Sequence, residues 1–68
     1  MIWTTLDGRK IPTKDMTHQH RVNSINKIIR DKKLYTQHIK PEMYNTTEGS
    51  LYILDSWLEI VQEHNARN

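Results

Sequence analysis

Cysteine is absent from this 68-residue chain. Disulfides and zinc sites built from thiolates are therefore excluded. No apolar run approaches the roughly 18 consecutive residues that a membrane-spanning helix needs. The first residues show no basic segment followed by an apolar one, so we expect no signal peptide, no membrane partner and a cytoplasmic protein. The chain is short enough for one domain over residues 1–68, and oligomerisation is the remaining common way to stabilise so small a core.

Motifs typical of enzymes are also missing. The chain contains no G-x-S-x-G, no P-loop and no H-E-x-x-H segment. His18 and His20 lie two positions apart, which on a helix points them about 200° apart, so they cannot share a metal ion. Catalysis would need a site shared between subunits. We therefore predict a protein that is not an enzyme and has neither a metal nor a cofactor.

The densest apolar stretch runs from Leu51 to Val61. Its spacing predicts a helix over residues 47–64, with an apolar arc about half the circumference wide, which is more than one core usually covers. Part of this arc is therefore expected to pack on a second subunit, through Leu51, Leu54, Trp57, Leu58 and Val61. The opposite side carries Asp55, Glu59 and Glu63, which are expected either to meet basic side chains or to face water.

The beginning of the chain predicts a β-hairpin over residues 2–12. Asp7-Gly8 separates two segments rich in β-branched and aromatic residues, which is typical of a two-residue type I′ turn. That turn would pair Leu6 with Arg9 and Trp3 with Pro12. A two-stranded hairpin is unstable alone, so its apolar face should pack on a helix.

A second helix is predicted over residues 16–33, because Val22, Ile25 and Ile29 recur at helical spacing. His18 falls on the same stripe, and we expect it to form a hydrogen bond with the connector that follows the hairpin. Residues 34–46 have no clear period and are predicted to form an ordered loop, with a short helical turn at Pro41. The predicted fold class is α+β: an N-terminal β-hairpin followed by two helices.

Charge is distributed unevenly along the chain. Residues 1–40 contain nine lysines and arginines and three acidic residues, a net charge of +6, whereas residues 41–68 contain one arginine and five acidic residues, a net charge of −4. The positive half predicts an acidic protein partner, or else nucleic acid or a phosphate-bearing nucleotide bound in a basic seam, or simply solvated charge. Alternatively, the two halves neutralise each other, either within the folded chain or between head-to-tail subunits. Its expected basic surface comprises Arg9, Lys10, Lys14, Arg21, Lys27, Arg30, Lys32 and Lys33.

The segment from Trp3 to Pro12, followed by Asp15-Met16-Thr17, His18 or His20, Asn23 and Ile25, resembles the opening of many small phage-encoded proteins. That opening has the form W-T-x-x-D-G-x-x-I, then D/E-M-[ST], then a helix with His and Asn. The resemblance covers about 25 residues and none of the acidic helix. It implies a phage accessory protein in an infected bacterial host, acting on a host or anti-phage defence protein.

Together these patterns predict a protein that inhibits or remodels its partner by direct protein–protein contact. The alternative is an oligomeric binder of nucleic acid or nucleotides. The expected partner-binding residues are a basic set and, as its complementary patch, an acidic pair of the last helix: Arg9, Lys10, Lys14, Lys27, Arg30, Asp55 and Glu59.

Overall fold

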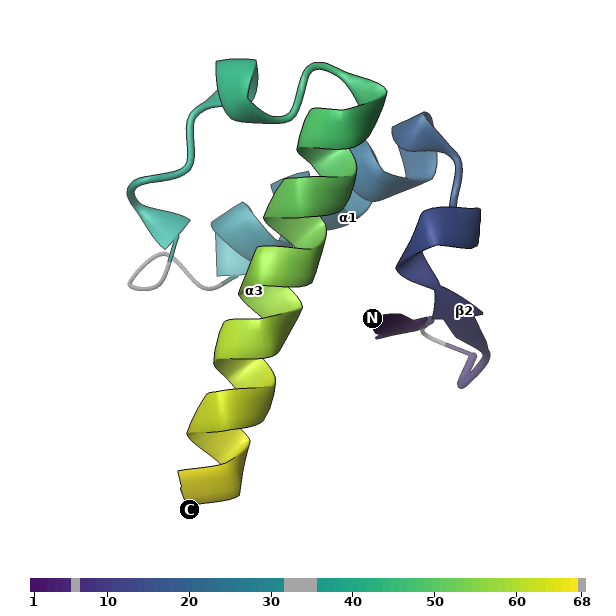
Figure 1. Cartoon of the computed structure of the whole chain (residues 1–68), viewed down its shortest axis with the longest axis vertical. Coiled ribbons are helices and arrows are strands. Elements are labelled where there is room, and N and C mark those ends of the chain that lie inside the picture. Colours follow the sequence, from purple (N-terminus) through teal and green to yellow (C-terminus); the bar gives the residue numbers. More distant parts are fainter. Residues whose placement is uncertain (6, 32–35, 68) are drawn as a thin grey trace.

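The computed structural model describes residues 1–5, 7–31 and 36–67, with side chains described as far as Glu63. The elements follow in the order β1 (Ile2–Thr4), β2 (Lys10–Pro12), η1 (Thr13–Asp15), α1 (His18–Asp31), η2 (Pro41–Met43) and α3 (Thr47–Arg67). The predicted fold class is confirmed: an antiparallel hairpin is followed by two helices that cross each other (Figure 1). No helix in the described part of the chain combines the length and apolarity needed to cross a membrane.

The hairpin forms where it was predicted, but its register differs by one residue. Ile2 pairs with Pro12, Trp3 with Ile11 and Thr4 with Lys10. The expected pairing of Trp3 with Pro12 is therefore wrong, and Leu6 lies outside the described residues.

A longer loop than the predicted two-residue turn explains this register. Thr5 N–H donates to Arg9 O at 2.8 Å, and Gly8 N–H donates to Thr5 O at 3.0 Å. Gly8 has a φ of 88°. A three-residue loop that ends in a left-handed glycine has this arrangement, in which Thr5 and Arg9 close the hairpin. The Asp-Gly pair correctly marked the position of the turn. It did not fix the loop length, because a glycine with φ > 0 is used in two-residue and three-residue loops alike.

Threonines cap both helices at their N-termini. Thr17 Oγ1 accepts a hydrogen bond from His20 N–H at 3.1 Å, and Thr46 Oγ1 accepts one from Gly49 N–H at 3.0 Å. Such side-chain bonds satisfy backbone donors that have no partner within the helix. The predicted helical turn at Pro41 is confirmed as η2, and α3 extends three residues beyond the predicted end at residue 64.

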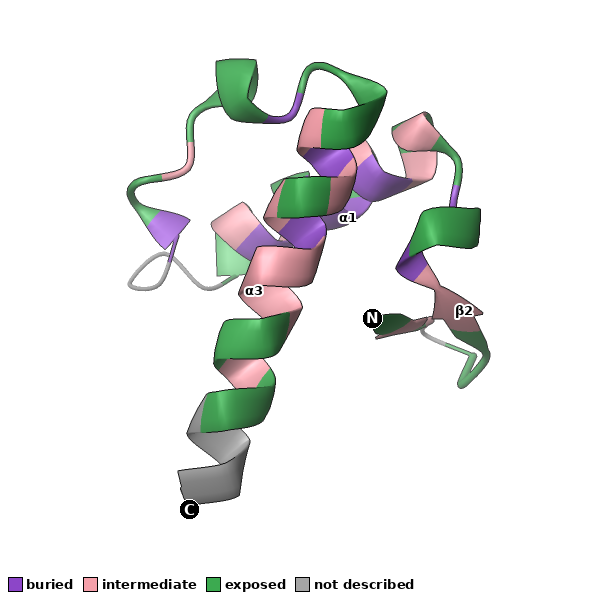
Figure 2. Ribbon diagram, viewed as in Figure 1, coloured by how far each residue is buried: buried purple, intermediate pink, exposed green. Residues whose placement is uncertain are grey.

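The core lies where α1 crosses the first half of α3 (Figure 2). It is built from Met16, Ile25, Ile28, Tyr44 and Leu54, all at most 7% exposed. The hairpin contributes Trp3 and Ile11, which are partly buried against this cluster. The apolar face of the hairpin thus packs on the helices, as its own instability requires.

Arg21 is not part of the basic surface, contrary to the prediction. Its side chain is 3% exposed, and its guanidinium donates to the carbonyl oxygens of Thr13 at 3.1 Å, Met16 at 2.7 Å and Thr47 at 3.1 Å. Its Nε donates to Ser50 Oγ at 2.9 Å. Arg21 therefore joins η1, α1 and the start of α3. The predicted basic residues Lys32 and Lys33 lie outside the described part of the chain.

His18 also has a different partner from the one expected. Its Nδ1 lies 2.9 Å from Ser50 Oγ on α3, and no described hydrogen bond joins its ring to the connector. Ser50 Oγ donates its one proton to Thr47 O at 3.0 Å and accepts from Arg21. Ser50 thus joins His18 and Arg21 of α1 to the first turn of α3.

Candidate partner-binding site

An open groove of about 450 Å³ lies between the hairpin and α1. Its hairpin side is formed by Trp3, Thr4, Thr5, Asp7 and Arg9, and its helix side by His20, Asn23, Ser24 and Lys27. We call this feature the hairpin–α1 groove. It brings together two of the predicted partner-binding residues, Arg9 and Lys27, which lie 18 positions apart in the sequence.

The helix side of the groove follows from helical spacing. His20, Asn23 and Lys27 recur at i, i+3 and i+7, so they share one face of α1. The buried stripe of Ile25 and Ile28 lies on another face and holds the helix against α3. The polar face of α1 is thereby turned toward the hairpin.

The hairpin side combines an aromatic surface with fixed charge. Trp3 is half-buried because its ring packs against the core, and its remaining surface lines the groove. Arg9 Nε lies 3.1 Å from Asp7 Oδ2, so the loop holds this guanidinium in place. Both side chains are largely exposed, and such a pair contributes little to stability.

The pKa of Asp7 lies below its ordinary value. A hydrogen bond from Thr5 Oγ1 is the main cause that lowers the pKa of Asp7, and the hydrogen bonds from Arg9 add to it. The charged carboxylate accepts both bonds, so both favour its ionised form. The groove therefore contains one firmly ionised carboxylate beside its two cations.

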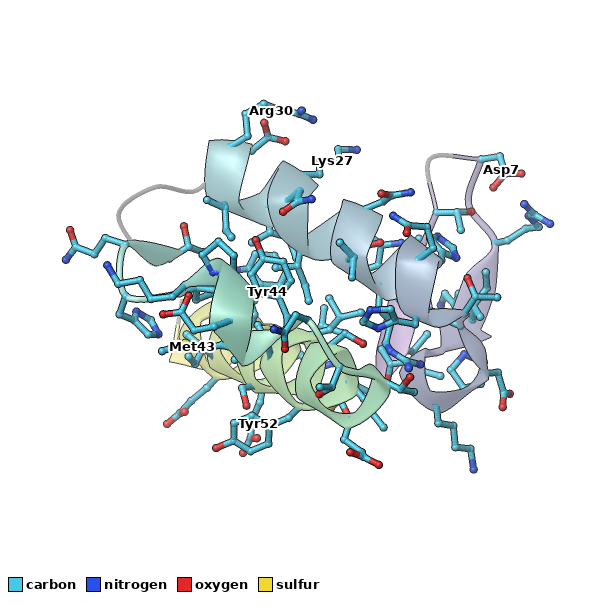
Figure 3. The ribbon with its side chains drawn as sticks, turned by 90° about the horizontal axis from the view of Figure 1, so that it is seen from above. Asp7, Lys27, Arg30, Met43, Tyr44 and Tyr52 are labelled. Carbon is cyan, nitrogen blue, oxygen red and sulfur yellow. The ribbon has the colours of Figure 1, made fainter. Side chains whose placement is uncertain are left out.

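The other predicted basic residues lie outside the groove. Lys10 and Lys14 are exposed on β2 and η1, and Arg30 is exposed in the last turn of α1. Arg30 Nε approaches Asp31 Oδ1 at 3.8 Å. Figure 3 shows Asp7, Lys27 and Arg30 along one side of the molecule, away from Tyr52. The basic set thus forms a broad surface, and two of its members, Arg9 and Lys27, border the groove.

The two acidic residues predicted to bind a partner differ in their contacts. Asp55 Oδ1 accepts a hydrogen bond from Thr13 Oγ1 at 2.5 Å and lies 3.9 Å from the N-terminal ammonium. This carboxylate therefore ties η1 and the start of the hairpin to α3. Glu59, one turn later, is exposed. The cation nearest to Asp55 is therefore the N-terminal ammonium rather than a basic side chain.

The residues predicted for self-association differ in burial. Leu54 is 0% exposed and belongs to the core of this chain, so it is unavailable at a surface. The other four are half-buried: Leu51, Trp57, Leu58 and Val61. Ile60 and Tyr52 on the same helix are 46% and 72% exposed.

Two further hollows border α3 or the segment that precedes it. One of about 460 Å³ is lined mainly by His18, Gln19, Asn26, Tyr44 and Asn45, and Tyr44 Oη donates to Asn26 Oδ1 at 2.8 Å. The other, about 40 Å³, lies against Trp57, whose buried Nε1 has no hydrogen-bond partner among the described residues. Within the described part of the chain, no three His, Asp or Glu side chains gather as metal ligands.

Sequence reasoning did not single out Trp3, His20, Asn23 or Ser24 as members of a common site. The polar spacing of α1 indicated that His20, Asn23 and Lys27 share a face, but nothing in the sequence showed that this face meets the hairpin. Comparison with protein families, curated proteins and solved structures found no match to this chain.

Proposed function

We propose that this chain is a binding protein that holds an acidic face of a protein partner against the surface around the hairpin–α1 groove. The observation that carries this proposal is the convergence of Arg9 and Lys27 on a hollow that Trp3 also lines. Partly exposed aromatic and arginine side chains are the residue types that contribute most to protein interfaces. Lys10, Lys14 and Arg30 around it would attract the same acidic face at longer range.

The charge balance of the groove favours a protein over a polyphosphate. Asp7 lines the groove beside Arg9 and carries a lowered pKa, so it stays ionised near neutral pH. A nucleotide phosphate would meet this carboxylate at close range, and that repulsion weakens binding. A protein surface can place a carboxylate near Lys27 and a donor near Asp7 at the same time. Nucleic acid or a nucleotide remains the alternative ligand.

The resemblance of residues 3–25 to small phage proteins suggests where the partner is found. We propose a host or anti-phage defence protein, inhibited or remodelled by occlusion of the surface that this chain covers. Such action needs no catalytic group from the chain itself.

We propose in addition that a second copy packs on the second half of α3. Trp57, Leu58 and Val61 are half-buried there, and Figure 1 shows the last turns of α3 extending beyond the other described elements. The opposite net charges of residues 1–40 and 41–68 favour a head-to-tail arrangement of copies. Light scattering after size exclusion tests this: Val61→Glu should lower the molar mass to that of one chain, whereas Gln62→Glu, an equal charge at an exposed neighbour, should not.

The test of partner binding is capture from lysate of a bacterial host by the tagged chain, with and without nuclease. A stoichiometric protein that survives nuclease is expected. The double variant Arg9→Glu/Lys27→Glu should lose it, while the double variant Lys40→Glu/Gln37→Glu, at two exposed positions away from the groove, should retain it. The proposal would be contradicted if the chain captured only nucleic acid. It would also be contradicted if the Arg9→Glu/Lys27→Glu variant captured the protein as well as the wild-type chain does.

A further inference from the structure

The two edges of the hairpin differ in the backbone hydrogen-bonding groups that are available to a further strand. Thr5 N–H donates to Arg9 O, and Thr13 N–H donates to Met1 O, both at 2.8 Å. Because bonded residues alternate in an antiparallel ladder, the odd-numbered residues of β1 face β2. Ile2 and Thr4 therefore direct their N–H and C=O groups to the opposite edge. No described residue forms a hydrogen bond with these groups.

The outer edge of β2 is protected against further pairing. Pro12 lies opposite Ile2 in the register, at a position where its nitrogen faces outward, and it has no N–H to donate. Lys10, the other outward-facing residue of β2, carries an exposed charge. Proline and lysine are the residues with which proteins block exposed sheet edges. The strand β1 has neither, since its outward positions are the β-branched residues Ile2 and Thr4, which favour a strand.

The unprotected edge of β1 lies along the hairpin–α1 groove. Trp3, Thr4 and Thr5 all line this groove, whereas Lys10, Ile11 and Pro12 of β2 do not. Side chains of consecutive strand residues point to opposite faces. A hollow on one face of the strand would be bordered by alternate residues only. Because three consecutive residues border this hollow, it lies at the edge of the strand. The opposite wall is the face of α1 that carries His20, Asn23 and Lys27.

We propose that β1 accepts an extended, acidic segment of the partner protein as a third strand, seated in the hairpin–α1 groove. This inference rests on the proposed function and names the part of the partner that is recognised. Main-chain hydrogen bonds to Ile2 and Thr4 supply affinity that is independent of side chains, and the groove walls supply specificity. Arg9 and Lys27 border the same groove, so acidic side chains of the added strand are attracted to it. A third strand also stabilises a hairpin that is marginal alone.

The first test uses a defined probe, an eight-residue peptide of alternating glutamate and valine with both ends blocked. Amide NMR of the full chain should show exchange at Ile2 and Thr4 slowed about tenfold or more by saturating peptide, with Lys10 unchanged. A peptide with lysine in place of glutamate should have no effect. Unchanged exchange at Ile2 and Thr4 with the acidic peptide would overturn the proposal.

The second test removes backbone hydrogen-bond donors from the peptide and leaves the protein unchanged. Two peptides are compared, one N-methylated at every valine and the other at every glutamate. Only one set of amides faces β1 in a strand, so one peptide should bind about tenfold or more weaker than the other. Equal affinities would mean that the peptide binds through its side chains alone, and the proposed strand would be wrong.

Paired proline variants separate this inference from the proposed function. Thr4→Pro removes the outward N–H of β1, and Lys10→Pro removes the equivalent group on the other edge. We expect Thr4→Pro to abolish both peptide binding and partner capture, whereas Lys10→Pro should bind as well as Lys10→Ala, which loses the same charge but keeps the N–H. If Thr4→Pro retains a partner that Arg9→Glu/Lys27→Glu loses, the added strand is refuted while the proposed function stands. If the wild-type chain captures no protein but the peptide still protects Ile2 and Thr4, the edge is a strand acceptor and the proposed protein partner is refuted.

Discussion

Arg21 Nε lies 2.9 Å from Ser50 Oγ, and through this contact a buried cation on α1 is joined to the first turns of α3. No carboxylate pairs with Arg21 among the described side chains. Its charge is instead held by carbonyl oxygens of Thr13, Met16 and Thr47. Thr47 lies 26 positions from Arg21 in the sequence, so one side chain joins the start of α3 to η1 and α1.

Replacing Arg21 with methionine should be among the most damaging single changes to stability. The substitution keeps an apolar stem but removes the donor from two buried carbonyl oxygens, those of Thr13 and Met16, and from the partly buried carbonyl oxygen of Thr47. Each lost partner costs about 1–3 kcal/mol, with the buried ones costing most. We expect the free energy of unfolding, measured by urea denaturation, to fall by about 3 kcal/mol or more. Arg30→Met on the exposed end of α1 is the control and should change it by less than about 0.5 kcal/mol. Equal effects would show that the Arg21 contacts do not stabilise the fold.

Gly49→Ala should destabilise the protein even though alanine favours helices. A Cβ at position 49 would lie 2.5 Å from the carbonyl oxygen of Met43 and 2.9 Å from Thr46 Oγ1. The closer atom is backbone, so η2 would have to move away from α3. The better helix propensity of alanine alone would raise the free energy of unfolding by about 1 kcal/mol. Such overpacking lowers it by about 1–3 kcal/mol, so we expect a net loss of stability.

Thermal unfolding followed by circular dichroism measures the sign of this effect. Ser56→Ala, on the half-buried side of the same helix, is the comparison because it adds alanine without a new Cβ. A higher melting temperature for Gly49→Ala would show that η2 does not pack on α3 as described.

Asp55 and Glu59 should respond differently to truncation, although they look equivalent in the sequence. Asp55 accepts a hydrogen bond from the buried Thr13, whereas Glu59 is exposed. We expect Asp55→Ala to lower the free energy of unfolding by about 1 kcal/mol, a figure reduced for the partial exposure of its carboxylate. Glu59→Ala should leave it unchanged within error. If both variants unfold at the same denaturant concentration, the Asp55–Thr13 contact contributes nothing.

The lowered pKa of Asp7 should depend on Thr5. The Thr5 hydroxyl bonds the ionised carboxylate, so Thr5→Val should raise the pKa of Asp7 toward its ordinary value of 3.8. Because the folded pKa lies below that value, the stabilisation from Asp7 is fully present above about pH 3.8 and is lost as pH falls through the lower, folded pKa. A carbon-13 NMR titration of the Asp7 carboxyl group measures the shift. Thr4→Val is the control, and an equal shift in both variants would contradict the assigned cause.

Part of the candidate site was readable from the sequence. Arg9 and Lys27 were expected on a partner-binding surface, and the structure places both in one groove. Lys10, Lys14 and Arg30 are exposed, as that surface requires. The pairing of Asp55 with Thr13 was not readable, because a hydrogen bond across 42 positions depends on where η1 meets α3.

The position of Arg21 along the helix indicated its burial, although its charge made it look like a surface residue. Arg21 lies three positions after His18 and four before Ile25, which puts it on the apolar stripe of α1. Ser50 is likewise four positions before Leu54, on the apolar side of α3. Polar residues on an apolar stripe indicate a buried pair, but helical spacing cannot tell which polar group on one helix meets which on another.

Local rules in the sequence determined the elements of this protein. Apolar spacing set the two helices, threonines set where they begin, and Asp-Gly set the hairpin turn, because each acts over a few residues of chain. Only the tertiary structure decided the hairpin register, the burial of Arg21 and Leu54, and the groove between β1 and α1. These depend on contacts between distant segments, in which the loss of water from a side chain is offset only when the correct partner arrives from elsewhere in the chain.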